Sequence, residues 1–173
     1  STRWTKMIEL DKTDDIWTVT LNRPDKANAL THDMLENLVD IAHSATDARG
    51  FILTGTGKVF SAGADLEAAK AGLATSDVWE RLSTAIALMP CLTIAALNGT
   101  LAGGATGMVL ACDLRIAVEN AKFFYPVMKL GYLPQPSDPI RMSTLIGPAR
   151  TKMILMAGQK IDAATALTYG LID

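Results

Sequence analysis

The stretch LNGTLAGGATGMVLACD, residues 97–113, places four glycines inside a mainly apolar run, at Gly99, Gly103, Gly104 and Gly107. Glycine in a helix interior costs about 1 kcal/mol relative to alanine, so four of them require close backbone approach, an unusual φ or room for a ligand. The preceding segment CLTIAAL, residues 91–97, predicts a fully buried strand, and the glycine-rich segment predicts a turn followed by a helix. This order of strand, turn and helix indicates the fold class.

Strands and helices alternate on both sides of this stretch. Residues 6–10 and 16–22 flank a polar turn and predict a hairpin, and residues 50–55 and 114–118 predict further strands. Helices are expected over residues 31–45, after Asp65, and over 76–89, where apolar residues recur at helical spacing. From residue 134 onward three short helical segments follow, at 137–147, 148–158 and 162–170. The alternation predicts an α/β fold with parallel strands and crossover helices.

Length and charge indicate how many domains the chain forms and which kinds of partner it is not expected to bind. The chain has 173 residues, of which 49% are hydrophobic, and we expect one domain over residues 1–173 with a helical part from about residue 134. The formal net charge is -2, with 16 basic and 18 acidic residues mixed along the chain. This balance gives no electrostatic reason to expect nucleic acid or an anionic membrane as a partner.

Cysteine content and hydropathy indicate the compartment. Cys91 and Cys112 are too few for a disulfide framework or a zinc site, so we expect a cytoplasmic protein without a metal centre. No apolar run approaches the roughly 20 residues that span a bilayer, and the sequence shows no leader, so a soluble protein is expected.

Two glycine-rich loops follow predicted strands, FSAGADL at residues 60–66 and NGTLAGGATG at 98–107. Ligands of such sheets bind where loops leave the carboxyl ends of strands, so both loops are candidates to face one ligand. A helix that begins near Gly103 presents free N–H groups suited to an oxyanion or a phosphate. Neither Walker nor GxGxxG spacing is present, which disfavours a nucleotide. The alternative is that the glycines only allow tight packing of the helix on the sheet.

Six segments, in order and at the expected spacing, make the chain resemble the enoyl-CoA hydratase/isomerase family, also called the crotonase superfamily. They are LNRPDKANAL (21–30), GKVFSAGADL (57–66), NGTLAGGATG (98–107), CDLRIA (112–117), LGYLP (130–134) and LTYGLID (167–173). The resemblance covers nearly the whole chain. It implies stacked ββα units with parallel sheets and flanking helices, a C-terminal helical segment that is truncated or absent here, and a homotrimer or hexamer.

The resemblance also implies an acyl-CoA thioester as the partner, with coenzyme A carried as part of the substrate and no separate cofactor. By position, the CoA moiety falls to Lys26, Ala27, Ala62, Asp65 and Leu66. The main-chain N–H groups of Ala64 and Gly104 correspond to the family's oxyanion hole, which stabilises a forming enolate. The glycines at 103 and 104 would let the thioester carbonyl reach the backbone, while Gly99 is expected to serve the turn.

The pattern departs from the family's hydratases at two positions. The resemblance aligns their two catalytic glutamates with Gly107 and Val127, and neither residue can deprotonate water or protonate the α-carbon. Hydration is therefore not expected, and isomerisation, decarboxylation or C–C hydrolysis fit a glutamate-free site better. A non-catalytic acyl-CoA-binding protein is the alternative. Dehalogenation is disfavoured because Gln135 stands near the position of the family's nucleophilic aspartate.

Two residues are candidates to move a proton in place of those glutamates. Asp138 is the nearest carboxylate in sequence, but Asp138 followed by Pro139 also predicts a helix N-cap. Tyr125 is a candidate phenolic donor or a core residue. Asp65 is likewise expected to cap the start of a helix rather than to act as a catalytic acid.

The remaining candidates favour structural roles. His32 and His43 fall in the first long helix, where a packed or solvent-facing histidine is the default. Trp79, Leu82, Ile86 and Met89 lie at helical spacing in a segment that lines the acyl pocket in the family, although such a stripe also fits a core.

Overall fold

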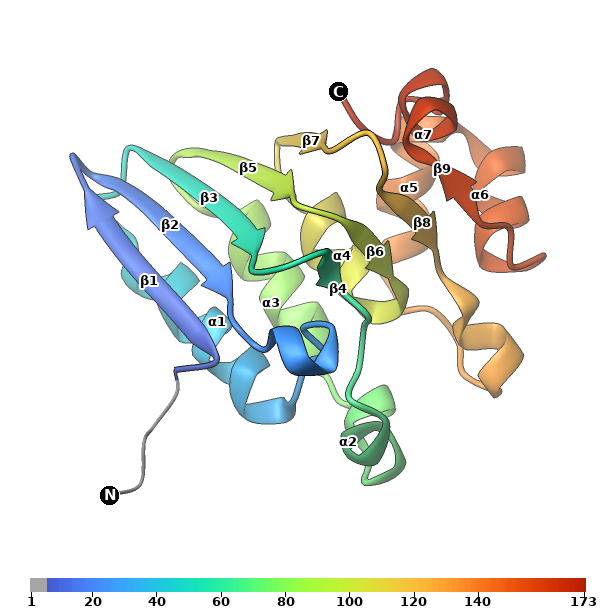
Figure 1. Ribbon diagram of the computed structural model, residues 1–173, viewed down its shortest axis with the longest axis horizontal. Helices are drawn as coiled ribbons and strands as arrows, with labels where there is room; N and C mark the ends of the chain where they lie inside the picture. The colour runs from blue at the N-terminus through green and yellow to red at the C-terminus, as the bar shows by residue number, and fades with distance from the viewer. Residues whose placement is uncertain (1–5) are drawn as a thin grey trace.

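The computed structural model describes residues 6–173, which form two sheets flanked by helices (Figure 1). The larger sheet has the strand order β1-β2-β3-β5-β7. Its strands are β1 (Ile8–Thr13), β2 (Ile16–Leu21), β3 (Gly50–Gly55), β5 (Leu92–Leu97) and β7 (Leu114–Ala117). The β1–β2 pair is antiparallel, as the hairpin prediction requires, and turns at Asp14 and Asp15, both with positive φ. The other three pairs are parallel.

The smaller sheet has the order β4-β6-β8-β9. Its strands are β4 (Val59–Ser61), β6 (Thr100–Ala102), β8 (Lys122–Phe124) and β9 (Ile161–Asp162). The first three are parallel to one another, and β9 is antiparallel to β8. Each of β3, β5 and β7 is followed by a short strand of this second sheet and then by helical segments. This order gives the stacked ββα units that the resemblance implies, so the fold class is confirmed.

Helices cover one side of the larger sheet and close its core (Figure 1). The α-helices are α1 (His32–Ser44), α2 (Leu66–Lys70), α3 (Val78–Ala87), α4 (Thr106–Leu110), α5 (Asp138–Ile146), α6 (Pro148–Leu155) and α7 (Ala163–Tyr169). The 3-10 turns are η1 (Pro24–Lys26), η2 (Leu73–Thr75), η3 (Gly103–Ala105) and η4 (Pro126–Leu130). The side chain of Thr31 caps α1 by accepting from the amide of Met34. The apolar stripe of α1 is buried, as its spacing predicts.

The second sheet agrees with the parallel sheets that the resemblance implies, but the sequence pattern did not locate its strands, because strands of two or three residues are too short to show alternation. It also corrects the role of Gly99. A β-carbon there would lie 1.9 Å from the carbonyl oxygen of Lys58, so Gly99 allows the backbone entering β6 to pass against that entering β4.

Within residues 6–173, no helix has the length and apolar character to cross a membrane. The same residues bring together no cluster of three metal-ligating side chains. Cys91 and Cys112 are both free thiols.

Candidate active site

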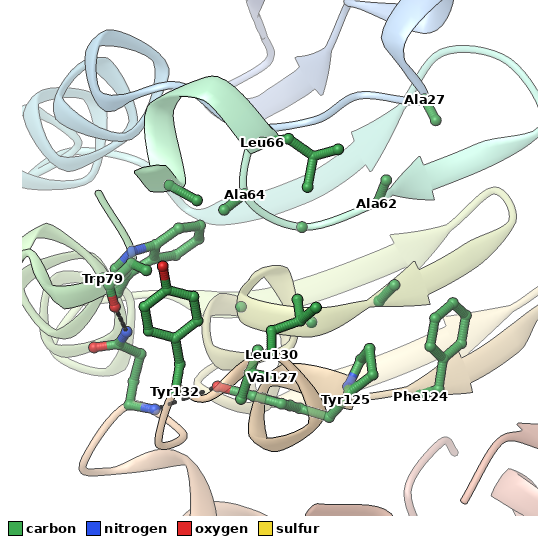
Figure 2. A pocket seen from close by; sticks show the side chains of 18 of the residues that line it. Ala27, Ala62, Ala64, Leu66, Trp79, Phe124, Tyr125, Val127, Leu130 and Tyr132 are labelled. Carbon is green, nitrogen blue, oxygen red and sulfur yellow. Dashed lines mark hydrogen bonds between the residues drawn. The ribbon is translucent and has the colours of Figure 1, made fainter. Parts of the chain in front are cut away.

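A cavity of about 340 Å³ opens between the two glycine-rich loops and the segment after β8 (Figure 2). Most of its lining comes from three chain segments that the smaller sheet brings together: residues 62–66 after β4, residues 102–104 after β6, and residues 124–135 after β8. The other lining residues are Ala27, Val59, Ala69, Ala74, Trp79 and Thr100. In the described part of the chain, none of the lining residues carries a charged side chain. The cavity is therefore mainly apolar and uncharged.

Ala64 lines this cavity, and an isolated parallel bridge joins it to Leu30. The amide of Leu30 donates to the carbonyl of Gly63 at 2.8 Å, and the amide of Asp65 donates to the carbonyl of Leu30 at 2.8 Å. Successive backbone groups of an extended segment point to opposite sides, so the N–H of Ala64 points away from Leu30. Among residues 6–173 it has no hydrogen-bond partner.

The amide of Gly104 is the second free donor. Gly104 is the middle residue of η3, and the first N–H groups of a helical segment have no partner within it. No hydrogen bond of this N–H to another described group is present. Both loops follow neighbouring parallel strands, β4 and β6, so both donors emerge at the same edge of the smaller sheet.

The two loops lie in direct backbone contact. A β-carbon on Gly63 would lie 3.0 Å from the carbonyl oxygen of Ala102 and 3.5 Å from the amide nitrogen of Gly104. Gly63 has a φ of +96° and Gly103 a φ of +60°, conformations that glycine adopts at low cost. Glycines at these two positions therefore hold the donors of Ala64 and Gly104 at one place.

Trp79 of α3 forms one wall of the cavity (Figure 2). Its indole Nε1–H donates to the carbonyl of Leu73 at 2.9 Å, and a β-carbon on Gly104 would lie 3.2 Å from its ring. A β-carbon on Gly104 would therefore press tightly against this ring. The other members of the predicted stripe, Leu82, Ile86 and Met89, are buried in the core and do not line the cavity.

Tyr125 and Asp138 form a buried pair behind the cavity lining. The Tyr125 hydroxyl and Oδ2 of Asp138 are hydrogen-bonded at 2.5 Å, and the Tyr125 oxygen also accepts from the amide of Gln135 at 3.3 Å. Figure 2 draws this second contact as a dashed line. Tyr125 lines the cavity and is 1% exposed, while Asp138 is 0% exposed. The two sequence candidates for proton transfer are therefore in direct contact.

The environment of Asp138 favours its protonated form. Burial raises the pKa of Asp138 to about 7, the hydrogen bond from Tyr125 opposes this rise, and the nearby charge of Glu80 adds to it. Burial also raises the pKa of Tyr125, and the charge of Asp138 raises it further. The Oδ1 atom of Asp138 has no partner among the described residues.

The helix-cap interpretation of Asp138 is wrong. Asp138 is the first residue of α5, the N-cap is Ser137, and the Asp138 side chain turns to Tyr125 instead of the helix amides. The start of α5 is held by Glu80, whose Oε1 accepts from the amide and the hydroxyl of Ser137 at 2.9 Å each. No motif marked Glu80, because its partner lies 57 residues away in the sequence.

Gly107 of α4 lies against the Asp138 carboxyl. A β-carbon on Gly107 would lie 2.7 Å from Oδ1 and 3.1 Å from Oδ2 of Asp138, which is closer than real contacts allow. The space beside Gly107 is thus occupied by the carboxyl group of Asp138, which belongs to α5. Val127, the residue aligned with the second hydratase glutamate, lines the cavity with an apolar side chain.

The residues expected to hold the CoA moiety lie on one side of the cavity. Ala27, Ala62 and Leu66 line it, and Lys26 is exposed on η1 next to Ala27. Asp65 caps α2 by accepting from the amide of Ala68 at 3.0 Å and pairs with Arg23 at 2.9 Å. These two contacts lower the pKa of Asp65, the Ala68 amide most, and confirm its predicted capping role.

Comparisons with known proteins agree with this geometry. Residues 11–173 match the family model described as enoyl-CoA hydratase/isomerase. Over 172 residues the chain is 39% identical to a Bacillus subtilis protein that carries the name enoyl-CoA hydratase/isomerase YngF, covering 94% of this chain and 66% of that protein.

Two solved structures show the same fold. The enoyl-CoA hydratase of Bacillus anthracis superposes with a TM-score of 0.86 at 35% identity, covering 96% of this chain and 69% of that one. DspI of Pseudomonas aeruginosa gives a TM-score of 0.89 at 30% identity, covering 99% and 74%. The chain therefore belongs to the enoyl-CoA hydratase/isomerase family of enzymes, the crotonase superfamily. It spans about two thirds of the length of YngF and of the Bacillus anthracis hydratase.

Proposed function

We propose that the cavity binds an acyl-CoA thioester with its carbonyl oxygen between the N–H groups of Ala64 and Gly104, and that the protein is an enzyme acting through the thioester enolate. The observation that carries this proposal is the pair of unpartnered amides at one apolar cavity. A preorganised donor in such a site is worth about 3 kcal/mol of transition-state stabilisation. Two donors act together on the oxygen that gains charge.

The coenzyme A portion is assigned to the side of the cavity formed by Ala27, Ala62 and Leu66, with Lys26 and Asp65 next to these residues in the sequence. Lys26 offers a positive charge to phosphate groups of the ligand. Asp65 contributes indirectly, because it caps α2 and forms an ion pair with Arg23 and so fixes the positions of both. Coenzyme A enters as part of the substrate, and the proposed reaction uses no separate cofactor.

Isomerisation, decarboxylation or C–C hydrolysis fits this site better than hydration. Hydration needs a group at the cavity surface that deprotonates water, and the lining within residues 6–173 contains no carboxylate or histidine. Decarboxylation needs enolate stabilisation more than a base, so it is the first reaction to test. The lack of charged lining also supports a second candidate, an acyl-CoA-binding protein without catalysis.

We further propose a homotrimer or hexamer in the cytoplasm. Exposed apolar side chains gather on and around η4, α5 and α6, which supports a contact between copies; they are Met128, Leu130, Leu133, Ile140, Met153 and Met156. Two free thiols without a disulfide support a reducing compartment.

A panel of thioesters tests the proposed function. Enoyl-, 3-oxoacyl- and malonyl-type CoA thioesters are incubated with the protein, binding is titrated, and products are identified by mass. We expect binding of the panel and a product that has lost carbon dioxide, been cleaved at a C–C bond or shifted its double bond. Rapid hydration of crotonyl-CoA contradicts the proposed reaction class, and binding without any product supports the non-catalytic candidate.

A further inference from the structure

The Asp138 carboxyl lies against Gly107, and a purely structural role for Asp138 does not explain this arrangement. The Asp138 carboxyl is fully buried, one of its oxygens has no partner among the described residues, and it sits where a side chain on Gly107 would otherwise stand. A buried carboxyl with an unsatisfied oxygen is costly to folding. Such a cost, in a group bonded to a residue that lines the cavity, points to use of the carboxyl.

Tyr125 connects this carboxyl to the cavity. Its hydroxyl is bonded to Oδ2 of Asp138, and Tyr125 itself is part of the cavity lining whereas Asp138 is not. The amide of Gln135 donates to the same phenolic oxygen and fixes its position. Tyr125 thus both binds the Asp138 carboxyl and lines the cavity.

We infer that Tyr125 and Asp138 form a proton-transfer pair for the α-carbon of the bound thioester, with Tyr125 the catalytic residue and Asp138 the positioning residue behind it. The inference rests on the proposed function, because it requires a thioester enolate at Ala64 and Gly104. It supplies that site with a proton carrier in place of glutamates at 107 and 127.

The Tyr125 O–H bond breaks and its proton goes to the α-carbon, where the electron pair of the enolate C=C bond forms the new C–H bond and the carbonyl C=O is restored. Tyr125 takes the proton of the Asp138 carboxyl, which becomes a carboxylate. In reverse, Tyr125 removes the α-proton while the Asp138 carboxylate accepts the phenolic proton. The negative charge thus resides on Asp138 and not on the phenolate.

The charges facing Asp138 come from three elements. Glu80 of α3 and Arg141 of α5 act on it with opposite sign, and Tyr125 after β8 is its hydrogen-bond donor. Burial holds the pKa of Asp138 at about 7, so the pair switches between its proton-donating and proton-accepting forms near neutral pH.

Exchange of the α-hydrogens of a saturated thioester in D₂O tests this pair without requiring a complete reaction. Butyryl-CoA is incubated with the protein, and deuterium uptake is followed by mass at several pD values. We expect exchange that rises through an apparent pKa near 7 and then levels, because removal of the α-proton needs the ionised pair. Tyr125→Phe should slow exchange by about 100-fold or more.

Asp138→Asn should slow exchange and remove its dependence on pD, a result that a merely structural Asp138 would not give. Tyr169→Phe and Asp162→Asn are the matched controls: Tyr169 lies on α7 away from the cavity lining, and Asn retains the capping role of Asp162. Both controls should exchange at the wild-type rate. Circular dichroism and butyryl-CoA titration establish that each variant is folded and binds.

The outcomes separate the two proposals. A folded wild type that does not bind butyryl-CoA overturns the proposed function, and the proton-transfer pair with it. Binding without exchange in the wild type, exchange in Tyr125→Phe within twofold of wild type, or an unchanged pD profile in Asp138→Asn overturns the pair alone.

Discussion

At the scale of single residues, Gly107 and Asp138 depend on each other. Any side chain at 107 must displace the Asp138 carboxyl, since a β-carbon would lie 2.7 Å from Oδ1. The carboxyl cannot retreat easily because Oδ2 is held by Tyr125. The lack of a side chain at Gly107 thus provides the space that the Asp138 carboxyl occupies.

A double-mutant cycle tests this dependence. Gly107→Ala alone should lower the free energy of unfolding by about 1–3 kcal/mol, the usual cost of overpacking, despite the higher helix propensity of alanine. In an Asp138→Ala background the same substitution should be neutral or stabilising. Urea unfolding of the four proteins measures the coupling. Additive effects would show that the two residues do not compete for the same space.

The sequence identified most of the site residues but not their arrangement. Ala64 and Gly104 followed from the resemblance of two loops, and the strand pairing of β4 and β6 explains why both amides reach one cavity. The contact between Tyr125 and Asp138 was not predictable, because an aspartate before a proline has the same pattern as a helix cap. Glu80 had no local signal at all, since its role depends on how α3 packs near α5.

At the scale of elements, α2 is a five-residue helix that depends on its cap. Helices this short are not stable alone, so Asp65, which binds the Ala68 amide and Arg23, holds α2 in place. Because Leu66 and Ala69 of α2 line the cavity, the cap connects helix stability to ligand binding.

Asp65→Ala tests this connection. We expect a loss of about 1 kcal/mol in the free energy of unfolding, together with a several-fold weaker Kd for an acyl-CoA. Asp162→Ala is the control, because Asp162 caps α7 in the same way but lies outside the cavity lining. It should lose comparable stability while its Kd, measured by calorimetry, stays unchanged. Equal weakening of binding in both variants would refute the local role of α2.

The longer helices, α1 and α3, and the strands of the larger sheet were predictable because each is long enough to show its period. The buried face of α1 and the strands at 50–55 and 92–97 match the expected segments closely. The smaller sheet was not predictable, since its strands are short and gain their stability from pairing across distant parts of the chain.

At the scale of the whole molecule, the raised pKa of Asp138 makes global stability depend on pH. The unfolded carboxyl has a pKa near 3.9, whereas burial raises the folded value to about 7. Between these values the folded state binds more protons than the unfolded state, so the free energy of unfolding falls as pH rises from about 4 to 7. Stability from this group is fully present below pH 4 and is lost above 7.

Asp138→Asn should abolish this fall. Relative to the variant, wild type should lose on the order of 4 kcal/mol between pH 4 and 8, measured by urea unfolding at each pH. The groups whose pKa is lowered, Glu36, Asp65 and Asp162, lose their contributions only as pH falls below about 4, and both proteins share them. Parallel stability curves for the two proteins would contradict the buried, protonated state of Asp138.

The two donors at the cavity are main-chain groups fixed by the pairing of β4 with β6, and no side chain has to be present for them to exist. The two amides can therefore be kept as a fixed pair of donors while the side chain that transfers the proton is exchanged by mutation. Moving the carboxyl from α5 back to α4, with Gly107→Glu and Asp138→Gly together, would change the chemistry while leaving the two amides untouched. The two substitutions have to be made together. Gly107→Glu alone would clash with the Asp138 carboxyl, and Asp138→Gly alone would leave a cavity.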